Sequence, residues 1–429
     1  MALTILTLSF IVFLLLGVPV AFAIGLSAAC TILYEGLPLL VVFQRMYSGM
    51  SVFTFLAIPF FIFAGELMLY GGIADRIVIF AKNLVGHIRG GLGMANVVAC
   101  TLFGGISGSP VADVSAMGSV MIPMMKKEGY HVDYAVNVTT HASLVGALTP
   151  TSHNMIIYSL AASGKVSIAA LILAGVLPTF VLMVCMLVAA YLVAVHRGYP
   201  AGTFPGWGAV GLSFARALPG LAVAGIIIWG ILSGVFTATE SAAIAVLYAI
   251  VITAAAYRSM SWENFLKASA RAVKTTGVIM LLIGVSATFQ YLIGLYGVAD
   301  LTGRWIASIS TEPWVVFLLV NLILFLLGTF MDMASTILIC TPIFLPIMAH
   351  YGMDPVQFGI VLLVNCALGL NTPPVGTTQF VGCAIGGVSV GHVMRTIWPF
   401  YGALTACLLA VTYVPAFSMW LPRLLGAAS

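Results

Sequence analysis

Charged side chains are scarce in this sequence. Aspartate, glutamate, lysine and arginine make up 7% of its 429 residues, whereas 62% are hydrophobic. Because soluble domains carry about 25% charged residues, this composition indicates a multi-pass protein of the lipid bilayer with little soluble mass. The net charge of +4 is small and spread between the apolar runs, so it bears on membrane orientation and argues against nucleic-acid binding.

The sequence also lacks the signatures of several common metal, catalytic and nucleotide sites. None of its seven cysteines forms a CxxC pair, which argues against a zinc site or a disulfide framework. It contains no HExxH motif, and Gly164-Lys165 is followed by valine, so no phosphate-binding loop is formed there. We therefore expect neither an enzyme nor an ATP-driven pump, and no cofactor.

What the sequence does contain is one stretch that occurs twice. Gly146-Ala147-Leu148-Thr149-Pro150 corresponds to Gly369-Leu370-Asn371-Thr372-Pro373 at an offset of 223 residues (369 − 146). A constant offset of this kind indicates an internal duplication. The same offset pairs Gly105 with Gly328, Pro123 with Pro346, Gly129 with Gly352, and Gly164 with Gly387.

Each Thr-Pro pair should interrupt a helix. Proline has no N–H group, and it pushes the residue before it out of the α region. Both pairs lie inside long apolar runs, at membrane depth, where irregular backbone is tolerated only if it is buried in protein or lines a cavity. A duplicated pair of broken helices is typical of the binding site of a secondary transporter. Two unrelated proline kinks are the alternative.

Two other apolar runs contain interruptions that favour helical hairpins. Residues 90–125 are divided by glycines and serines, with a predicted tip at Ser107-Gly108-Ser109. Each half has about 15 residues, whereas a crossing needs about 20, so the run should enter and leave on one side. Residues 313–345 repeat the pattern around Gly328 and Asp332, and broken helices are expected to follow at 131–162 and 355–388.

The distribution of charge predicts opposite orientations for the two hairpins. Under the positive-inside rule, a hairpin flanked by basic residues enters from the cytoplasm. The second hairpin has only Arg304 nearby, beside Asp300, Glu312 and Asp354, so it should enter from the other side. We predict an all-α polytopic membrane protein with two inverted repeats, each containing a re-entrant helical hairpin and a broken transmembrane helix. The basic residues around the first hairpin are Arg76, Lys82, Arg89, Lys126 and Lys127.

The combination of these motifs resembles the large membrane subunit of a tripartite ATP-independent periplasmic (TRAP) transporter over essentially the whole chain. The motifs are Ser107-Gly108-Ser109-Pro110, the Pro123/Gly129 and Pro346/Gly352 pairs, and the two Gly-x-x-Thr-Pro breaks. The most specific is Asn371-Thr372-Pro373-Pro374-Val375-Gly376. The sequence departs from the pattern at Pro110 and at the first break, which reads Thr-Pro-Thr.

The resemblance implies an elevator mechanism, in which a sodium-driven transport domain moves along a static scaffold in the bacterial inner membrane. It also implies two separate partner chains, a four-helix small membrane subunit and a periplasmic substrate-binding protein. The cargo would be an organic anion such as a dicarboxylate, sialic acid or a sulfonate. A self-sufficient sodium- or proton-coupled symporter or exchanger of the same fold is the alternative.

On this basis we divide the chain into five segments. Residues 1–89 hold scaffold helices and a first arm at 36–50, and 90–162 hold the first half of the transport domain. Residues 163–310 hold further scaffold helices, a second arm at 258–274 and a lead-in span. Residues 311–390 hold the second half of the transport domain, and 391–429 a C-terminal span. Glu66 and Glu240 lie near the ends of spans and are expected at the membrane interface.

Sodium needs oxygen ligands, and a broken helix frees backbone carbonyls to supply them. We expect most ligands to be carbonyls, with hydroxyls from Thr149 and Thr372, and we expect the Thr372 hydroxyl to have no partner but the ion. The alternative is that the glycines only permit close helix packing. The first predicted sodium site consists of Ser107, Ser109, Gly146, Thr149 and Pro150, and the second of Gly328, Gly369, Thr372, Pro373 and Val375.

Four polar residues are candidates for contact with the cargo. Asp113 and Asp332 lie inside the hairpins, and an intramembrane acid is a functional candidate by default. Asn365 and Asn371 lie beside the second break. Helix capping or interhelical hydrogen bonding is the alternative for the two acids. For the histidines that flank the first break, His141 and His153, structural hydrogen bonding is favoured over a role in proton coupling.

Overall fold

The computed structural model describes residues 1–149 and 152–427. Within these ranges the regular elements are helices, apart from one isolated β-bridge between Arg89 and Ala201. Among the described residues, seven helices are long and apolar enough to cross a membrane. The number rises to eight if the bent pair α20 (Trp398–Tyr413) and α21 (Ala416–Leu424) forms one span. The predicted all-α, multi-pass architecture is confirmed.

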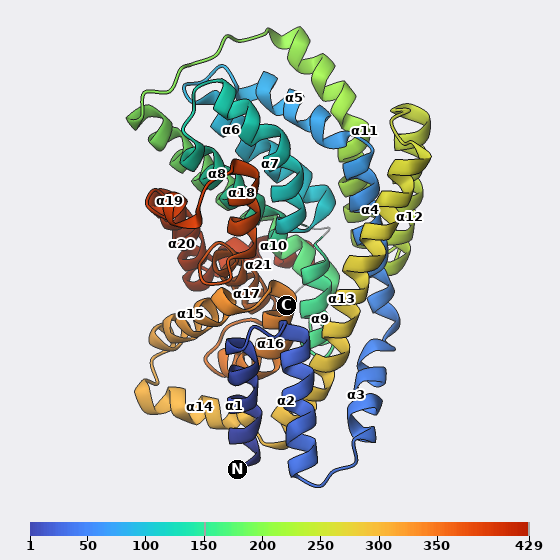
Figure 1. Cartoon of the computed structure of the whole chain (residues 1–429), viewed down its shortest axis with the longest axis vertical. Coiled ribbons are helices and arrows are strands. Elements are labelled where there is room, and N and C mark those ends of the chain that lie inside the picture. Colours follow the sequence, from blue (N-terminus) through green and yellow to red (C-terminus); the bar gives the residue numbers. More distant parts are fainter. Residues whose placement is uncertain (150–151, 428–429) are drawn as a thin grey trace.

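A first set of helices, called here the scaffold group, is connected through the longest helix, α13. This helix packs against α2, α3 and α4, and α4 in turn packs against α12 (Figure 1). The group consists of α1 (Ala2–Leu15), α2 (Val20–Tyr34), α3 (Leu40–Met50), η1 (Phe53–Leu56), α4 (Ala57–Tyr70), α11 (Trp207–Leu232), α12 (Ala238–Val251), η3 (Ile252–Ala256) and α13 (Trp262–Leu295).

A second set, called here the hairpin group, contains both hairpins and both broken helices. Its members are α6 (Gly91–Ser107), α7 (Pro110–Lys127), α8 (Val132–Ala142), η2 (Ser143–Leu148), α9 (His153–Ala161), α15 (Pro313–Phe330), α16 (Met333–His350), α17 (Pro355–Leu370) and α18 (Thr377–Gly386). Helix α10 (Ile168–His196) packs against α6, α17, α20 and α21. Our division of the sequence assigned α10 to the scaffold, whereas the structure places it beside the hairpins.

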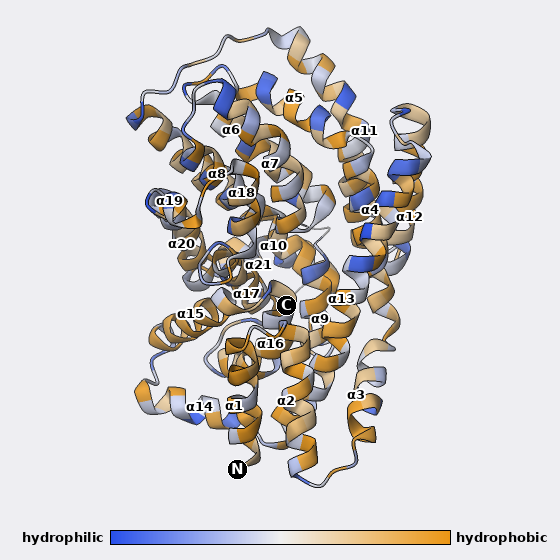
Figure 2. Ribbon diagram, in the orientation of Figure 1, coloured by the Kyte–Doolittle hydropathy of each residue, from blue (hydrophilic) through white to orange (hydrophobic). Residues whose placement is uncertain are grey.

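Short amphipathic helices connect the two groups. Helix α5 (Ile73–Val85) contacts α6 on one side and α11 on the other, and α14 (Val298–Ile309) contacts α16 and α13. Both carry hydrophilic residues, whereas α1, α2 and α15 are mostly hydrophobic in colour (Figure 2). The short α19 (Val390–Met394) follows α18. Helices α5 and α14 thus link the two groups, whereas the segments expected to form arms, 36–50 and 258–274, lie in α3 and at the start of α13 within the scaffold group.

The ends of the hairpin helices keep the offset found in the sequence. Helix α6 ends at Ser107 and α15 at Phe330, and α7 begins at Pro110 and α16 at Met333, which in both cases is 223 residues apart (330 − 107 and 333 − 110). The first tip turns at Gly108, whose φ of +62° suits glycine. The second tip turns at Asp332, which caps α16.

Both broken helices are interrupted where the Thr-Pro pairs predict. After η2 the backbone of Thr149 is extended, and α9 begins only at His153. In the second copy α17 ends at Leu370 and α18 begins at Thr377. Every residue from Val356 to Leu370 is buried, and so is every residue from Asp133 to Leu148. The chain that leads into each break is therefore buried within the hairpin group, whereas the second break itself is partly open, with Pro374 and Val375 exposed.

The second halves of the broken helices cross over between the repeats. Helix α9, from the first copy, packs against α16 and α17 of the second, and α18 packs against α7 and α8 of the first. The Tyr158 hydroxyl donates to the Pro355 carbonyl at 2.6 Å, and Thr140 donates to the Gln379 side chain at 3.1 Å. Each half of the hairpin group therefore packs against an element of the other.

Candidate functional site

The first break is held against the first hairpin by two glycines and a threonine. A Cβ atom on Gly104 would lie 2.6 Å from the Cα of Gly146, so this approach of α6 to η2 requires glycine. The Thr149 hydroxyl lies 2.7 Å from the carbonyl oxygens of both Gly104 and Gly146, and shares its one hydrogen between them. Three oxygens from two elements thus meet at one point.

Asp113 adds a carboxylate to this point. Its Oδ1 accepts a hydrogen bond from the Ser107 hydroxyl, which joins the two helices of the hairpin across their tip. Its Oδ2 is buried and has no hydrogen-bond partner within the described part of the chain. A Cβ on Gly104 would lie 2.9 Å from this Oδ2, and Gly146 faces it closely as well. A buried carboxylate oxygen of this kind calls for a cation or a proton.

Of the residues predicted for the first sodium site, the structure brings Ser107, Gly146 and Thr149 together around Asp113. Ser109 stands at the edge, where its backbone N–H donates to the Ser107 hydroxyl oxygen at 3.2 Å. Pro150 lies outside the described residues. The sequence missed Gly104, and it placed Asp113 with the cargo, whereas its free oxygen faces the break. We name Gly104, Ser107, Asp113, Gly146 and Thr149 the first oxygen cluster.

The second break repeats the close approach of glycines but has no carboxylate in it. A Cβ on Gly369 would lie 2.7 Å from the carbonyl oxygen of Gly328. The chain after the break returns to the hairpin, because the Val375 N–H donates to the Thr329 carbonyl at 3.2 Å. Pro373 is partly exposed, and the Val375 side chain is exposed. Gly328 and Gly369 are therefore in contact, while Val375 reaches the site only through its backbone.

The Thr372 hydroxyl has protein partners, so the expectation that it has none is wrong. It donates to the Leu368 carbonyl at 2.9 Å and lies 3.0 Å from the Tyr401 hydroxyl of α20. Tyr401 also donates to the Asn371 carbonyl at 2.8 Å. Because buried tyrosine hydroxyls usually find a hydrogen-bond partner, the sequence could have suggested that Tyr401 has one. It could not have shown that this partner lies in the second break. This residue was missed from the sequence.

The other candidates for cargo contact make structural hydrogen bonds. The Asp332 carboxylate accepts from the backbone N–H groups of Ala334 at 3.1 Å and Ser335 at 3.4 Å, the helix-capping alternative. Asn365 donates to the side-chain oxygen of Asn321 at 2.8 Å. The Asn371 side chain accepts from the Thr378 hydroxyl. Asn365 Oδ1 and Asn371 Nδ2 nevertheless stay buried without a hydrogen-bond partner among the described residues, and none of the three candidates lines the cavity beside the first hairpin tip.

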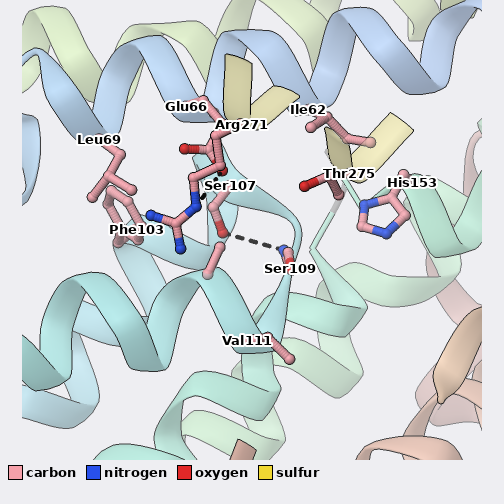
Figure 3. A pocket seen from close by; sticks show the side chains of 12 residues that line it. Ile62, Glu66, Leu69, Phe103, Ser107, Ser109, Val111, His153, Arg271 and Thr275 are labelled. Atoms are coloured by element: carbon pink, nitrogen blue, oxygen red, sulfur yellow. Dashed lines mark hydrogen bonds and ion pairs between the residues drawn. The ribbon is translucent and has the colours of Figure 1, made fainter. Parts of the chain in front are cut away.

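A cavity of about 160 Å³ does lie between the first hairpin tip and the scaffold group (Figure 3). The hairpin contributes Ser107 and Ser109, and the scaffold contributes Glu66 from α4 and Arg271 from α13. These two are the charged residues of its lining, with Arg271 Nε 3.6 Å from Glu66 Oε1. Ile62, Gly65, Leu69, Phe103, Val111, Ala112, His153 and Thr275 complete the wall.

Two expectations change at this cavity. Glu66 was expected at the membrane interface, but its side chain is buried because Gly65 lets α4 approach the backbone of Ser107. His153 lines the cavity, whereas the buried His141 ring is hydrogen-bonded to the Asn137 carbonyl at 2.8 Å, a structural role.

The sequence Gly387-Val388-Ser389-Val390-Gly391 has GxSxG spacing, but it joins α18 to α19 and lacks the strand-to-helix turn of a nucleophile elbow.

Comparison with known proteins adds a family. Residues 7–417 match the family described as the tripartite ATP-independent periplasmic transporter, DctM component. The chain is 42% identical over 419 residues to the Salmonella typhimurium protein YgiK, covering 97% of this chain and 96% of that protein. It is 38% identical over 410 residues to the C4-dicarboxylate TRAP transporter large permease protein DctM of Pseudomonas aeruginosa, covering 94% of each.

Two further similarities concern cargo and fold. The sialic acid TRAP transporter large permease protein SiaM of Vibrio cholerae is 34% identical over 409 residues, with 95% of each chain covered. Among solved structures, the YdaH transporter of Alcanivorax borkumensis superposes with a TM-score of 0.63 at 14% identity, covering 99% of this chain and 100% of that one. At that identity the likeness concerns the fold alone.

Proposed function

Because the chain belongs to the DctM component of the tripartite ATP-independent periplasmic transporters, we propose that it is the large permease of a sodium-coupled uptake system for small organic anions. It is a multi-pass transporter subunit of the inner membrane and not an enzyme. The sodium ion is a co-transported substrate. The observation that carries the coupling is the first oxygen cluster, where a buried Asp113 oxygen with no hydrogen-bond partner among the described residues lies beside two glycines whose carbonyls contact the Thr149 hydroxyl.

The first oxygen cluster has the chemistry of a sodium site. Sodium is bound in transporters by carbonyls of unwound helices and by side-chain oxygens, all of which meet here. Asp113 supplies the negative charge that balances the ion, so its assignment moves from cargo contact to ion binding. The second sodium site would be built from carbonyls around Gly328 and Gly369, with the remaining lone pair of the Thr372 hydroxyl. Each of the two sites would bind sodium only when its hairpin and its broken helix are in contact.

An elevator motion is supported by the division of the molecule into two groups. The hairpin group is interlocked by the crossing of α9 and α18. It is joined to the scaffold group by α5 and α14 and by direct contacts of α4 with α6 and of α13 with α16. We include α10, α20 and α21 in the moving unit, because they pack on α6 and α17. The constant offset of the helix ends supports two repeats, and the basic residues around the first hairpin support their inverted orientation.

The cargo is an organic anion delivered by a periplasmic binding protein, with a four-helix small membrane subunit as the third chain. The family description is tripartite, and relatives are named for C4-dicarboxylates and for sialic acid. The cavity beside the first hairpin tip suits such a cargo because it holds hydroxyls and one arginine. A self-sufficient carrier of the same fold is the second candidate, and a requirement for the binding protein separates the two.

Uptake into proteoliposomes tests this function. The chain is reconstituted with its small subunit, and the binding protein is added outside with radiolabelled succinate or sialic acid. We expect uptake when sodium is present outside, loss of uptake when potassium replaces it, and no requirement for ATP. Uptake that is indifferent to the replacement contradicts sodium coupling. Full uptake without the binding protein favours the self-sufficient carrier.

A further inference from the structure

The ion pair in the cavity is unusually loose. The ion pair joins Arg271 Nε to Glu66 Oε1 at 3.6 Å, too long for a hydrogen bond. By contrast, Arg197 holds both carboxylate oxygens of Asp133, at 2.9 and 2.8 Å. The second carboxylate oxygen of Glu66 is buried and has no partner within the described ranges. The Glu66 carboxylate is therefore poorly satisfied by Arg271, whose own side chain is about half exposed.

The place of the pair makes this looseness significant. Glu66 lies on α4 and Arg271 on α13, two scaffold helices that pack along each other, so the pair does not depend on the position of the hairpin. The Arg271 side chain is 46% exposed and that of Glu66 is 10% exposed. The guanidinium thus remains open to the cavity, beside the Ser107 side chain in Figure 3. A guanidinium is suited to bind carboxylates with two parallel hydrogen bonds, which Glu66 does not make here.

We propose that Glu66 is an internal substitute for the cargo. In the empty carrier its carboxylate neutralises Arg271, and the anionic group of the bound cargo displaces it by making the two-pronged contact that Glu66 lacks. This inference rests on the proposed function and adds a determinant of cargo affinity and of the transport cycle. Glu66 lowers the affinity for the cargo, and in return it keeps Arg271 paired when the cavity closes without cargo.

Glu66 should matter for net uptake but not for exchange of internal for external cargo. Net uptake requires the empty carrier to return to its starting conformation, and this step closes the cavity that contains Arg271. Burying a charge without a partner is costly, although a half-exposed arginine loses less than a buried one. Exchange of internal for external cargo never uses the empty return. Removing the Glu66 carboxylate should therefore slow net uptake and spare exchange.

The test uses Glu66→Gln in proteoliposomes that contain the chain and its small subunit, with the binding protein and radiolabelled succinate or sialic acid. We expect net uptake to fall by about tenfold, exchange to stay within about twofold of wild type, and the KM for exchange to fall several-fold. In the double variant Glu66→Gln/Arg271→Gln the ratio of net uptake to exchange should return toward wild type, with a raised KM.

The matched control is Glu263→Gln. Glu263 pairs with Lys267 at 2.6 Å on the exposed face of the same helix as Arg271, outside the cavity, so both rates should be unchanged. Equal losses of net uptake and exchange in Glu66→Gln, or an unchanged KM and ratio, would overturn the proposal. If that variant does not assemble, Arg271→Gln alone decides, because an unchanged KM there also overturns it. A wild-type protein without any uptake would instead refute the proposed function.

Discussion

Replacing Gly104 by alanine tests whether the first hairpin must touch the first break. Alanine in a helix is favoured over glycine by about 1 kcal/mol, so on propensity alone Gly104→Ala should stabilise α6. The new Cβ would lie 2.6 Å from the Cα of Gly146 and 2.9 Å from Asp113 Oδ2. Because Gly146 is backbone, the hairpin has to move, and overpacking of this kind costs about 1 to 3 kcal/mol. We expect net destabilisation of up to about 2 kcal/mol.

The control for this prediction is Gly225→Ala. Gly225 lies inside α11, and a Cβ there meets nothing within 4 Å among the described residues. It should be neutral or slightly stabilising. The assay is the thermal unfolding of the purified protein with and without sodium. In Gly104→Ala the sodium-dependent rise in Tm should shrink, because the Asp113 carboxylate is pushed aside. Identical behaviour of the two variants would refute the close contact on which the first oxygen cluster rests.

Further predictions concern the second half and the topology. Thr372→Val removes hydrogen bonds to Leu368 and Tyr401 and should lower stability by about 1 kcal/mol even without sodium, as should Tyr401→Phe; unchanged Tm values in sodium-free buffer would contradict these contacts. Asp332→Ala removes a helix cap and should cost about 1 kcal/mol, with the sodium concentration for half-maximal uptake unaltered. A cysteine introduced beside Lys126 should react with an impermeant reagent from the cytoplasm, and one beside His350 from the periplasm; labelling from one side would refute the inverted repeats.

The breaks and hairpins were predictable because glycine and proline act locally. Thr-Pro ends a helix through the chemistry of two neighbouring residues, and the constant offset added a second, independent sign. The assignment of Gly146 and Thr149 to one site followed from the same local logic. Their partner Gly104 could not be assigned in this way, because it lies 45 residues before Thr149 and their contact depends on how α6 and η2 pack.

The two intramembrane acids show where sequence reasoning stops. Asp113 and Asp332 look alike in composition, and both lie within a hairpin. Asp332 is the N-cap residue of α16, and its carboxylate accepts hydrogen bonds from the backbone N–H groups of Ala334 and Ser335. Asp113 lies further along α7, where Ser107 occupies one oxygen and leaves the other facing the break. A shift of one helical turn separates a cap from a candidate ion ligand, and only the position of the neighbouring element reveals it.

Glu66 and Arg271 were out of reach for a different reason. They are distant in the sequence, and their separation of 205 residues (271 − 66) differs from the offset of the duplication, so the repeat does not pair them. The composition of α4 places Glu66 near the end of a span, which is typical of an interfacial residue. Its burial follows from Gly65. Because glycine has no side chain, the Cα of Ser107 at the hairpin tip can lie 3.3 Å from where a Cβ atom of residue 65 would be. Tertiary packing alone turns that position into a cavity wall.

The most direct test of the account is sodium binding by the purified chain, measured by titration calorimetry on wild type and Asp113→Asn. The asparagine keeps the shape of the side chain and removes its charge, so it should fold and yet bind sodium at the first oxygen cluster at least about tenfold more weakly, a difference of about 1.4 kcal/mol. Lithium and potassium serve as competing ions. Sodium binding that is equally strong in Asp113→Asn would contradict the assignment of the first oxygen cluster as the coupling site.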